Sequence, residues 1–187
     1  MSDELIFALI VIFVICAILS IVFMGISLSK RKSAIMQADI LAVLESIRVI
    51  DPNNIKYEAI EKPKHQEALA YDYTLETNNY IYYIKVVPNF NNDEICVNNS
   101  VKWQTRRSYK DEHVRFVSNI DLLMRLDLEN KNNKKARKLY IIYPNAKSLL
   151  KYINECELEF VHYNTDVYGA KIITYLDLKD HINLIEL

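Results

Sequence analysis

Glycine is almost absent from this chain: only Gly25 and Gly169 occur among its 187 residues. Glycine-rich loops cradle phosphate groups because a residue without a side chain lets the backbone approach the ligand closely. The Walker A loop and the dinucleotide-binding fingerprint each need several glycines within one short segment. The sequence therefore excludes both of these nucleotide-binding motifs.

Cysteine and histidine are also scarce, and neither forms a recognisable site. Cys16, Cys96 and Cys156 lie far apart, and no two of them make a CxxC pair. The four histidines are scattered singly, so no spacing of His, Cys and carboxylates indicates a zinc site. We expect Cys96 and Cys156 to be small buried residues without a disulfide, and these residues predict no bound cofactor.

Net charge is lacking as well, because 23 Lys and Arg face 24 Asp and Glu. Such a balance gives no protein-wide field that would attract nucleic acid or a membrane surface.

What the sequence does contain is an uncharged apolar run over residues 5–28. At about 1.5 Å per residue, a helix of this length spans roughly 36 Å, enough to cross the ~30 Å hydrocarbon core of a membrane. The main alternative, a signal peptide, would have a positively charged start, a shorter apolar stretch and a cleavage site. Here the run follows the acidic segment 1–4 and is followed by the basic segment 30–32. We interpret it as a retained transmembrane helix.

The basic segment predicts the orientation of that helix. Lys30, Arg31 and Lys32 follow the apolar run, and no Lys or Arg precedes it. Positive residues that flank a transmembrane helix stay on the cytoplasmic side. We therefore expect a single-pass protein of a bacterial cell membrane, with residues 1–4 outside, 5–28 in the lipid bilayer, 29–33 as a linker and 34–187 as one cytoplasmic domain.

The pattern after residue 33 predicts an α+β (or α/β) domain, in which helices flank a mixed sheet. We expect a helix, three antiparallel strands, and then helix, strand, helix, strand, helix. The continuous apolar run 139–143 is typical of a central strand that is covered on both faces. The predicted helices are 36–50, which either continues from the anchor or begins after the linker, and 118–129, 146–156 and 178–187; the predicted strands are 55–61, 69–75, 80–87, a short fourth at 94–97, 139–143 and 170–176.

Two residues on neighbouring strands form the one pattern that resembles a known catalytic motif. Asp72 lies on a strand that a turn joins to the strand of Lys85. This order resembles the restriction-endonuclease-like, PD-(D/E)xK fold over about residues 34–143. In that family an Asp and an acidic-x-Lys triplet hold Mg²⁺ and steady the attacking water. The resemblance implies a Mg²⁺-dependent nuclease with Asp72 and Lys85 as catalytic residues.

The sequence departs from that family at the acidic position, where it has Tyr83, a poor ligand for Mg²⁺. Glu76 and Glu94 are the nearest carboxylates that could replace it. Two alternatives stay open. The chain is a family member that has kept the fold and lost the metal, or Asp72 and Lys85 are an edge Asp and a snorkelling Lys on a half-exposed sheet.

Two basic clusters are candidates for binding. Trp103 is the only Trp, and Arg106 and Arg107 follow it closely. Such a group either stacks a nucleic-acid base beside its phosphates or anchors a loop in the core with the Arg pair in solvent. A second cluster before residue 139 includes Lys134 and Lys135. It could extend a nucleic-acid surface or bind anionic lipid headgroups.

These features predict a membrane-anchored, non-catalytic binding or assembly module of unknown ligand. Two other functions stay open: a membrane-tethered Mg²⁺-dependent nuclease, and an interaction subunit of a membrane complex whose protein partner docks on the Tyr-rich sheet.

Overall fold

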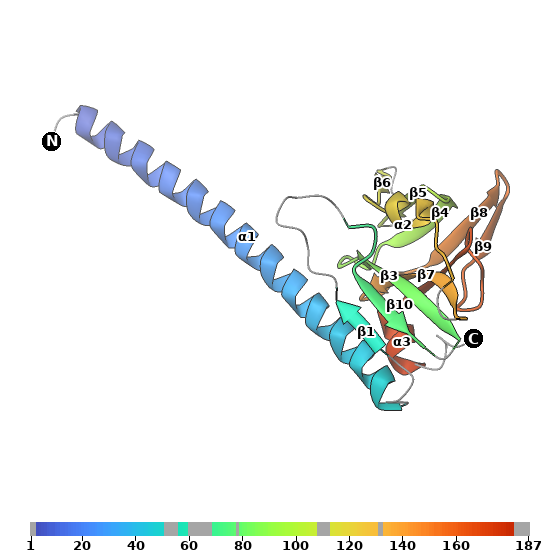
Figure 1. Ribbon diagram of the computed structural model, residues 1–187. Helices are drawn as coiled ribbons and strands as arrows, with labels where there is room; N and C mark the ends of the chain where they lie inside the picture. Colours follow the sequence, from blue (N-terminus) through green and yellow to red (C-terminus); the bar gives the residue numbers. More distant parts are fainter. Residues whose placement is uncertain are drawn as a thin grey trace. The chain divides into compact units, whose positions relative to one another are not determined.

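The computed structural model describes residues 3–50, 56–59, 69–77, 79–107, 113–130 and 133–181 (Figure 1). The chain divides into two compact units, Met1–Ile40 and Leu41–Leu187. The first unit is helical. The second contains two five-stranded mixed sheets and a few helices. This composition confirms the predicted α+β fold class.

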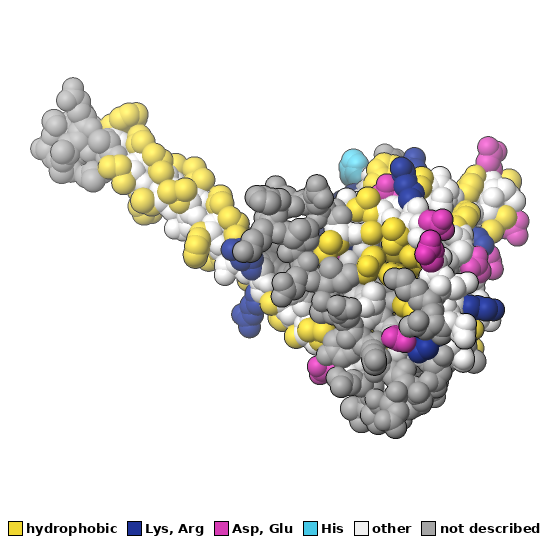
Figure 2. Space-filling view, viewed as in Figure 1, with side chains coloured by type: hydrophobic (Ala, Val, Ile, Leu, Met, Phe, Trp, Pro, Cys, Tyr) yellow, Lys and Arg dark blue, Asp and Glu magenta, His cyan; other side chains and the backbone are white. Residues whose placement is uncertain are grey.

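The first helix, α1, spans Asp3–Ile50 without a break, so the apolar run and the helix predicted after it are continuous. Every side chain over residues 10–28 is exposed. Figure 2 shows hydrophobic side chains covering this part of α1, with basic groups after them. The helix is long and apolar enough to span a membrane. It ends one residue before the Asp51–Pro52 bond, where the proline ring disfavours helical conformation.

Residues 41–50 of α1 belong to the second unit. Val43, Leu44 and Ile47 are buried there, whereas Glu45 is exposed. Positions i, i+1 and i+4 lie on one face of a helix, so this part of α1 is amphipathic.

The first sheet has the strand order β1-β2-β3-β7-β10. Its first three strands are antiparallel, and β3, β7 and β10 are parallel. All side chains over residues 139–143 are buried, which confirms the prediction of a central strand covered on both faces. The strands are β1 Lys56–Ala59, β2 Tyr73–Glu76, β3 Tyr80–Pro88, β7 Lys135–Tyr143 and β10 Ala170–Thr174.

The second sheet has the order β6-β5-β4-β8-β9. The β4 and β8 strands are parallel, and the other neighbours are antiparallel. The strands are β4 Glu94–Asn99, β5 Lys102–Arg106, β6 Arg115–Phe116, β8 Leu149–Asn154 and β9 Glu157–Phe160.

The two sheets share one hydrophobic core. Trp103 of β5 is fully buried there, and its ring centroid lies 4.7 Å from that of Tyr140 on β7. Tyr140 also donates a hydrogen bond from its hydroxyl to the Ile120 carbonyl at 2.8 Å. Core residues from the first sheet are Val87, Tyr140, Ile142, Ala170 and Ile172, and those from the second are Ile95, Val97, Trp103 and Leu149.

The two helices of the second unit that follow α1 are short. The α2 helix spans Asp121–Arg125, much less than the predicted 118–129. The α3 helix spans Tyr175–Asp180 and begins earlier than predicted, because the Thr174 hydroxyl caps it by accepting the Asp177 N–H at 3.1 Å. The end of the predicted terminal helix, residues 182–187, lies outside the described residues.

The predicted helix over residues 146–156 is wrong. This segment contains β8, which pairs with β4 on one side and with β9 on the other. The predicted strands also omit β5, β6 and β9, and β4 is present only as the short fourth strand that the predicted order leaves out. Cys156 lies in the turn between β8 and β9 and is exposed, so the expectation of a buried thiol is wrong for it, whereas Cys96 is half-buried.

Candidate functional site

Asp72 and Lys85, the predicted catalytic pair, do lie together. The Lys85 Nζ is 3.5 Å from the Asp72 Oδ1, and the side chains are only 13% and 20% exposed, respectively. Lys85 also donates a hydrogen bond to the Leu69 carbonyl at 2.7 Å. The second carboxylate oxygen, Asp72 Oδ2, accepts the Val86 backbone N–H at 2.9 Å. Both oxygens of Asp72 are therefore engaged by the protein.

The surroundings of this pair do not fit a Mg²⁺ ion. Tyr83 packs edge-on against Tyr71, with ring centroids 4.9 Å apart. Of the two carboxylates that could replace the missing acid, Glu76 pairs with Lys134 and Glu94 with Arg106. Within the described ranges, no three His, Cys, Asp or Glu residues gather where they could hold a metal. Asp72 and Lys85 therefore have the geometry of an ion pair that links the start of β2 to β3.

The structure separates Trp103 from the arginines that follow it. Trp103 lies in the core with no exposed surface, so it presents no face on which a base could stack. Arg106 pairs with Glu94, whose other oxygen accepts the Ser148 hydroxyl at 2.6 Å. Arg107 is exposed. Successive side chains of a strand point to opposite faces, so the tryptophan faces inward while Arg106 faces outward.

The second basic cluster is also divided. Lys134 donates a hydrogen bond to Glu76 Oε1 at 2.8 Å, so its charge is paired. Lys135 is the first residue of β7. Its backbone N–H donates to the Asn79 carbonyl, and its side chain is exposed. Of the five candidate residues, Trp103 is therefore buried, Arg106 and Lys134 are paired with glutamates, and Arg107 and Lys135 are exposed.

The Tyr-rich sheet is partly buried. Tyr73 and Tyr82 are buried, whereas Tyr80 and Tyr83 are half-buried. Large exposed hydrophobic side chains lie instead on the second sheet, at Phe116, Leu158 and Phe160.

The β9 strand is the feature that sequence reasoning missed. It is an edge strand among the described strands, and all four of its side chains are exposed. Leu158 is 46% and Phe160 62% exposed. The sequence signal was present, because Glu157-Leu158-Glu159-Phe160 alternates acidic and apolar residues with the period of a strand.

The backbone of β9 is open on its outer side. The Val161 N–H donates to the Leu149 carbonyl at 2.9 Å. Antiparallel pairs alternate between bonded and non-bonded positions, and the next pair, Leu150 with Phe160, is therefore non-bonded. By the same alternation, the N–H and C=O groups of Leu158 and Phe160 point away from β8.

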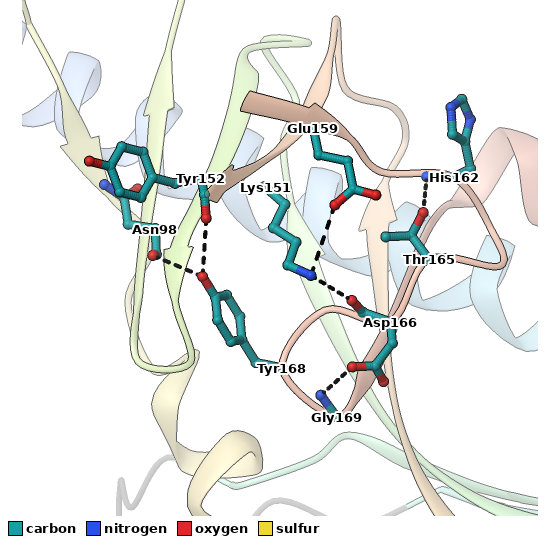
Figure 3. Close-up of polar contacts among 9 residues, drawn as sticks. All are labelled: Asn98, Lys151, Tyr152, Glu159, His162, Thr165, Asp166, Tyr168 and Gly169. Carbon is teal, nitrogen blue, oxygen red and sulfur yellow. Dashed lines mark hydrogen bonds and ion pairs between the residues drawn. The ribbon is translucent and has the colours of Figure 1, made fainter. Parts of the chain in front are cut away.

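The loop over residues 162–169 contacts the hairpin formed by β8 and β9 (Figure 3). The Tyr168 hydroxyl lies 3.2 Å from the carbonyls of both Asn98 and Tyr152. Lys151 donates to the Asp166 carbonyl at 3.0 Å. The loop ends in a tight turn at Gly169, whose φ of +82° favours a glycine at this position.

No family model, curated protein or solved structure matches this chain.

Proposed function

We propose that this chain is a single-pass membrane protein whose domain is a non-catalytic binding module that docks a protein partner along β9. The observation that carries the proposal is the exposed edge strand β9, whose side chains alternate between acidic and apolar. The anchor is supported by α1, whose exposed apolar surface would be costly in water and stable in lipid. The alternative of a metal-dependent nuclease has less support, because Asp72 pairs with Lys85, and Glu76 and Glu94 also pair with cations.

The orientation we propose is N-terminus outside and domain in the cytoplasm, because Lys30, Arg31 and Lys32 follow the apolar run. Cys156 offers a reporter, since it is exposed. In a Cys16→Ser/Cys96→Ser variant, a membrane-impermeant maleimide should leave right-side-out vesicles unlabelled and label Cys156 after detergent is added. Replacing all three basic residues with Glu should expose Cys156 in a fraction of the molecules. Labelling of sealed vesicles that carry the native charges would contradict the orientation.

The chemistry of β9 indicates its partner. Glu157 and Glu159 point to one face of the strand, and Leu158 and Phe160 to the other. An extended segment that alternates basic and apolar residues would complement both faces while its backbone bonds to the open edge. Antiparallel pairing of two copies of β9 would place glutamates opposite each other, which is destabilising. We therefore propose a partner protein and not a second copy.

A Leu158→Pro substitution should weaken this docking at least tenfold. Proline removes the outward N–H of residue 158 and is tolerated at the open side of an edge strand. The measurement is fluorescence anisotropy with the full chain in uncharged detergent and a labelled peptide of alternating Lys and Val. Phe116→Ala, which removes another exposed side chain of the second sheet, is the matched control.

Charge reversal tests the same surface without removing a backbone donor. Glu157→Lys/Glu159→Lys should lose the Lys–Val peptide and gain binding to a Glu–Val peptide. If the unmodified chain binds neither peptide, or binds both equally, β9 is not the docking strand we propose.

A further inference from the structure

A cavity of about 650 Å³ lies at the carboxyl ends of the parallel strands β7 and β10. In open α/β sheets, ligands bind outside this end of the strands. Small-molecule sites have volumes of roughly 300–1,000 Å³, so the cavity is of a suitable size. No residue of β9 lines it, and neither Asp72 nor Lys85 does. The cavity is therefore a separate candidate site.

The floor of this cavity is apolar and continues the core between the two sheets. Ile172 of β10 and Leu149 of β8 are buried core residues, and Ala146 and Val161 pack against the same core. Thr174, which also lines the cavity, lies two residues after Ile172, so both side chains project from the same face of β10. Such a floor suits the apolar body of a small molecule.

Asp177 is the acidic residue of the cavity wall, and the described part of the wall contains no Glu, Lys or Arg. The Thr174 hydroxyl donates to Asp177 Oδ2 at 2.6 Å and accepts the Asp177 backbone N–H at 3.1 Å. These capping bonds of α3 hold the carboxylate at the wall. No Lys or Arg of the described segments forms an ion pair with it. The cavity thus combines an apolar floor with a negative charge.

We infer that this cavity binds a small organic amine, whose apolar body lies on Ile172 and Leu149 and whose ammonium group contacts Asp177. The carboxylate attracts a cationic ligand and repels an anionic one. Tyr163 adds a partly exposed aromatic ring to the wall, and the face of such a ring also attracts cations. The inference is independent of the docking proposed for β9, because it concerns other residues.

Fluorine NMR of the full chain in uncharged detergent, with fluorinated benzylamine as the probe, tests this site. The amine should bind at least tenfold more tightly than fluorinated benzyl alcohol, which has the same apolar body without the charge. Fluorinated benzoate, whose charge is opposite, should bind more weakly than either. Titration of micelles without the protein measures how much of each probe enters the detergent.

Asp177→Asn should remove the preference for the amine and leave the alcohol bound as before. Asparagine keeps an oxygen for the Thr174 hydroxyl but carries no charge. Asp180→Asn is the matched control, since it removes the same charge from an exposed position of α3 that does not line the cavity.

Ala146→Leu tests whether the probes occupy the cavity itself. The larger side chain takes up space on the floor, so this variant should lose both the amine and the alcohol. Pulse proteolysis in urea shows whether each variant is folded. The inference is wrong if the amine binds no more tightly than the alcohol, or if Asp180→Asn weakens amine binding as much as Asp177→Asn does. It is also wrong if a folded Ala146→Leu variant binds both probes unchanged.

Discussion

Replacing Trp103 with alanine is expected to lower the free energy of unfolding of the domain by about 3–5 kcal/mol, the range for a large aromatic removed from a core. The side chain has no exposed surface and packs on Tyr140 where the two sheets meet. Pulse proteolysis in urea is a suitable measurement because it reports the opening of the domain. Circular dichroism would be dominated by α1, which detergent keeps helical.

Trp103→Phe separates the contribution of aromatic volume from that of the indole N–H. The indole Nε1 has no hydrogen-bond partner among the described residues, so phenylalanine leaves no acceptor unpaired. We expect it to cost roughly 1–2 kcal/mol, because most of the aromatic volume stays in the core. Arg107→Ala, at an exposed neighbouring position, should change stability by less than about 0.5 kcal/mol. A domain that tolerates Trp103→Ala would contradict the burial of the indole and would reopen the base-stacking interpretation.

Local patterns in the sequence predicted those elements whose apolar runs are compatible with only one type of secondary structure. The run that ends at residue 28 has no polar face, and the run over residues 139–143 is too short and too rich in Ile and Tyr for a helix. The structure has a helix over the first run and a strand over the second, as predicted. The segment 146–156 was not predicted correctly, because its short apolar stretch suits a helix or a strand equally. Its pairing with β4, some 50 residues earlier in the chain, decides between them.

The candidate sites show the same limit. The hairpin made the proximity of Asp72 and Lys85 predictable, and the structure places them in contact. The role of the pair depends on its hydrogen bonds with the Val86 N–H and the Leu69 carbonyl, which no spacing rule in the sequence reveals. The parallel pairing of β7 with β10 was not predictable, since Lys138 and Ala170 lie far apart in the sequence. The alternation in β9, by contrast, was readable and was overlooked.

The second large effect is expected at the Asp72–Lys85 pair. Asp72→Ala should lower the free energy of unfolding by about 2–4 kcal/mol, because it leaves a mostly buried ammonium without its counter-ion and the Val86 N–H without its acceptor. Asp72→Asn retains an oxygen for that N–H and should cost about half as much. Pulse proteolysis in urea is again the measurement.

A double-mutant cycle then separates a structural ion pair from a catalytic one. If the pair is structural, Asp72→Asn and Lys85→Met each destabilise the domain. The double variant should then lose at least about 1 kcal/mol less unfolding free energy than the two single losses added together, because the second substitution removes a charge that the first had left without its partner. A catalytic lysine makes the opposite prediction: Lys85→Met would leave stability nearly unchanged and abolish Mg²⁺-dependent cleavage of DNA or RNA by the full chain. Because both carboxylate oxygens of Asp72 are engaged by protein groups, we expect the first outcome, with no cleavage by the unmodified protein. Cleavage that requires Mg²⁺ and Lys85 would instead establish the nuclease and overturn the non-catalytic function proposed for this domain.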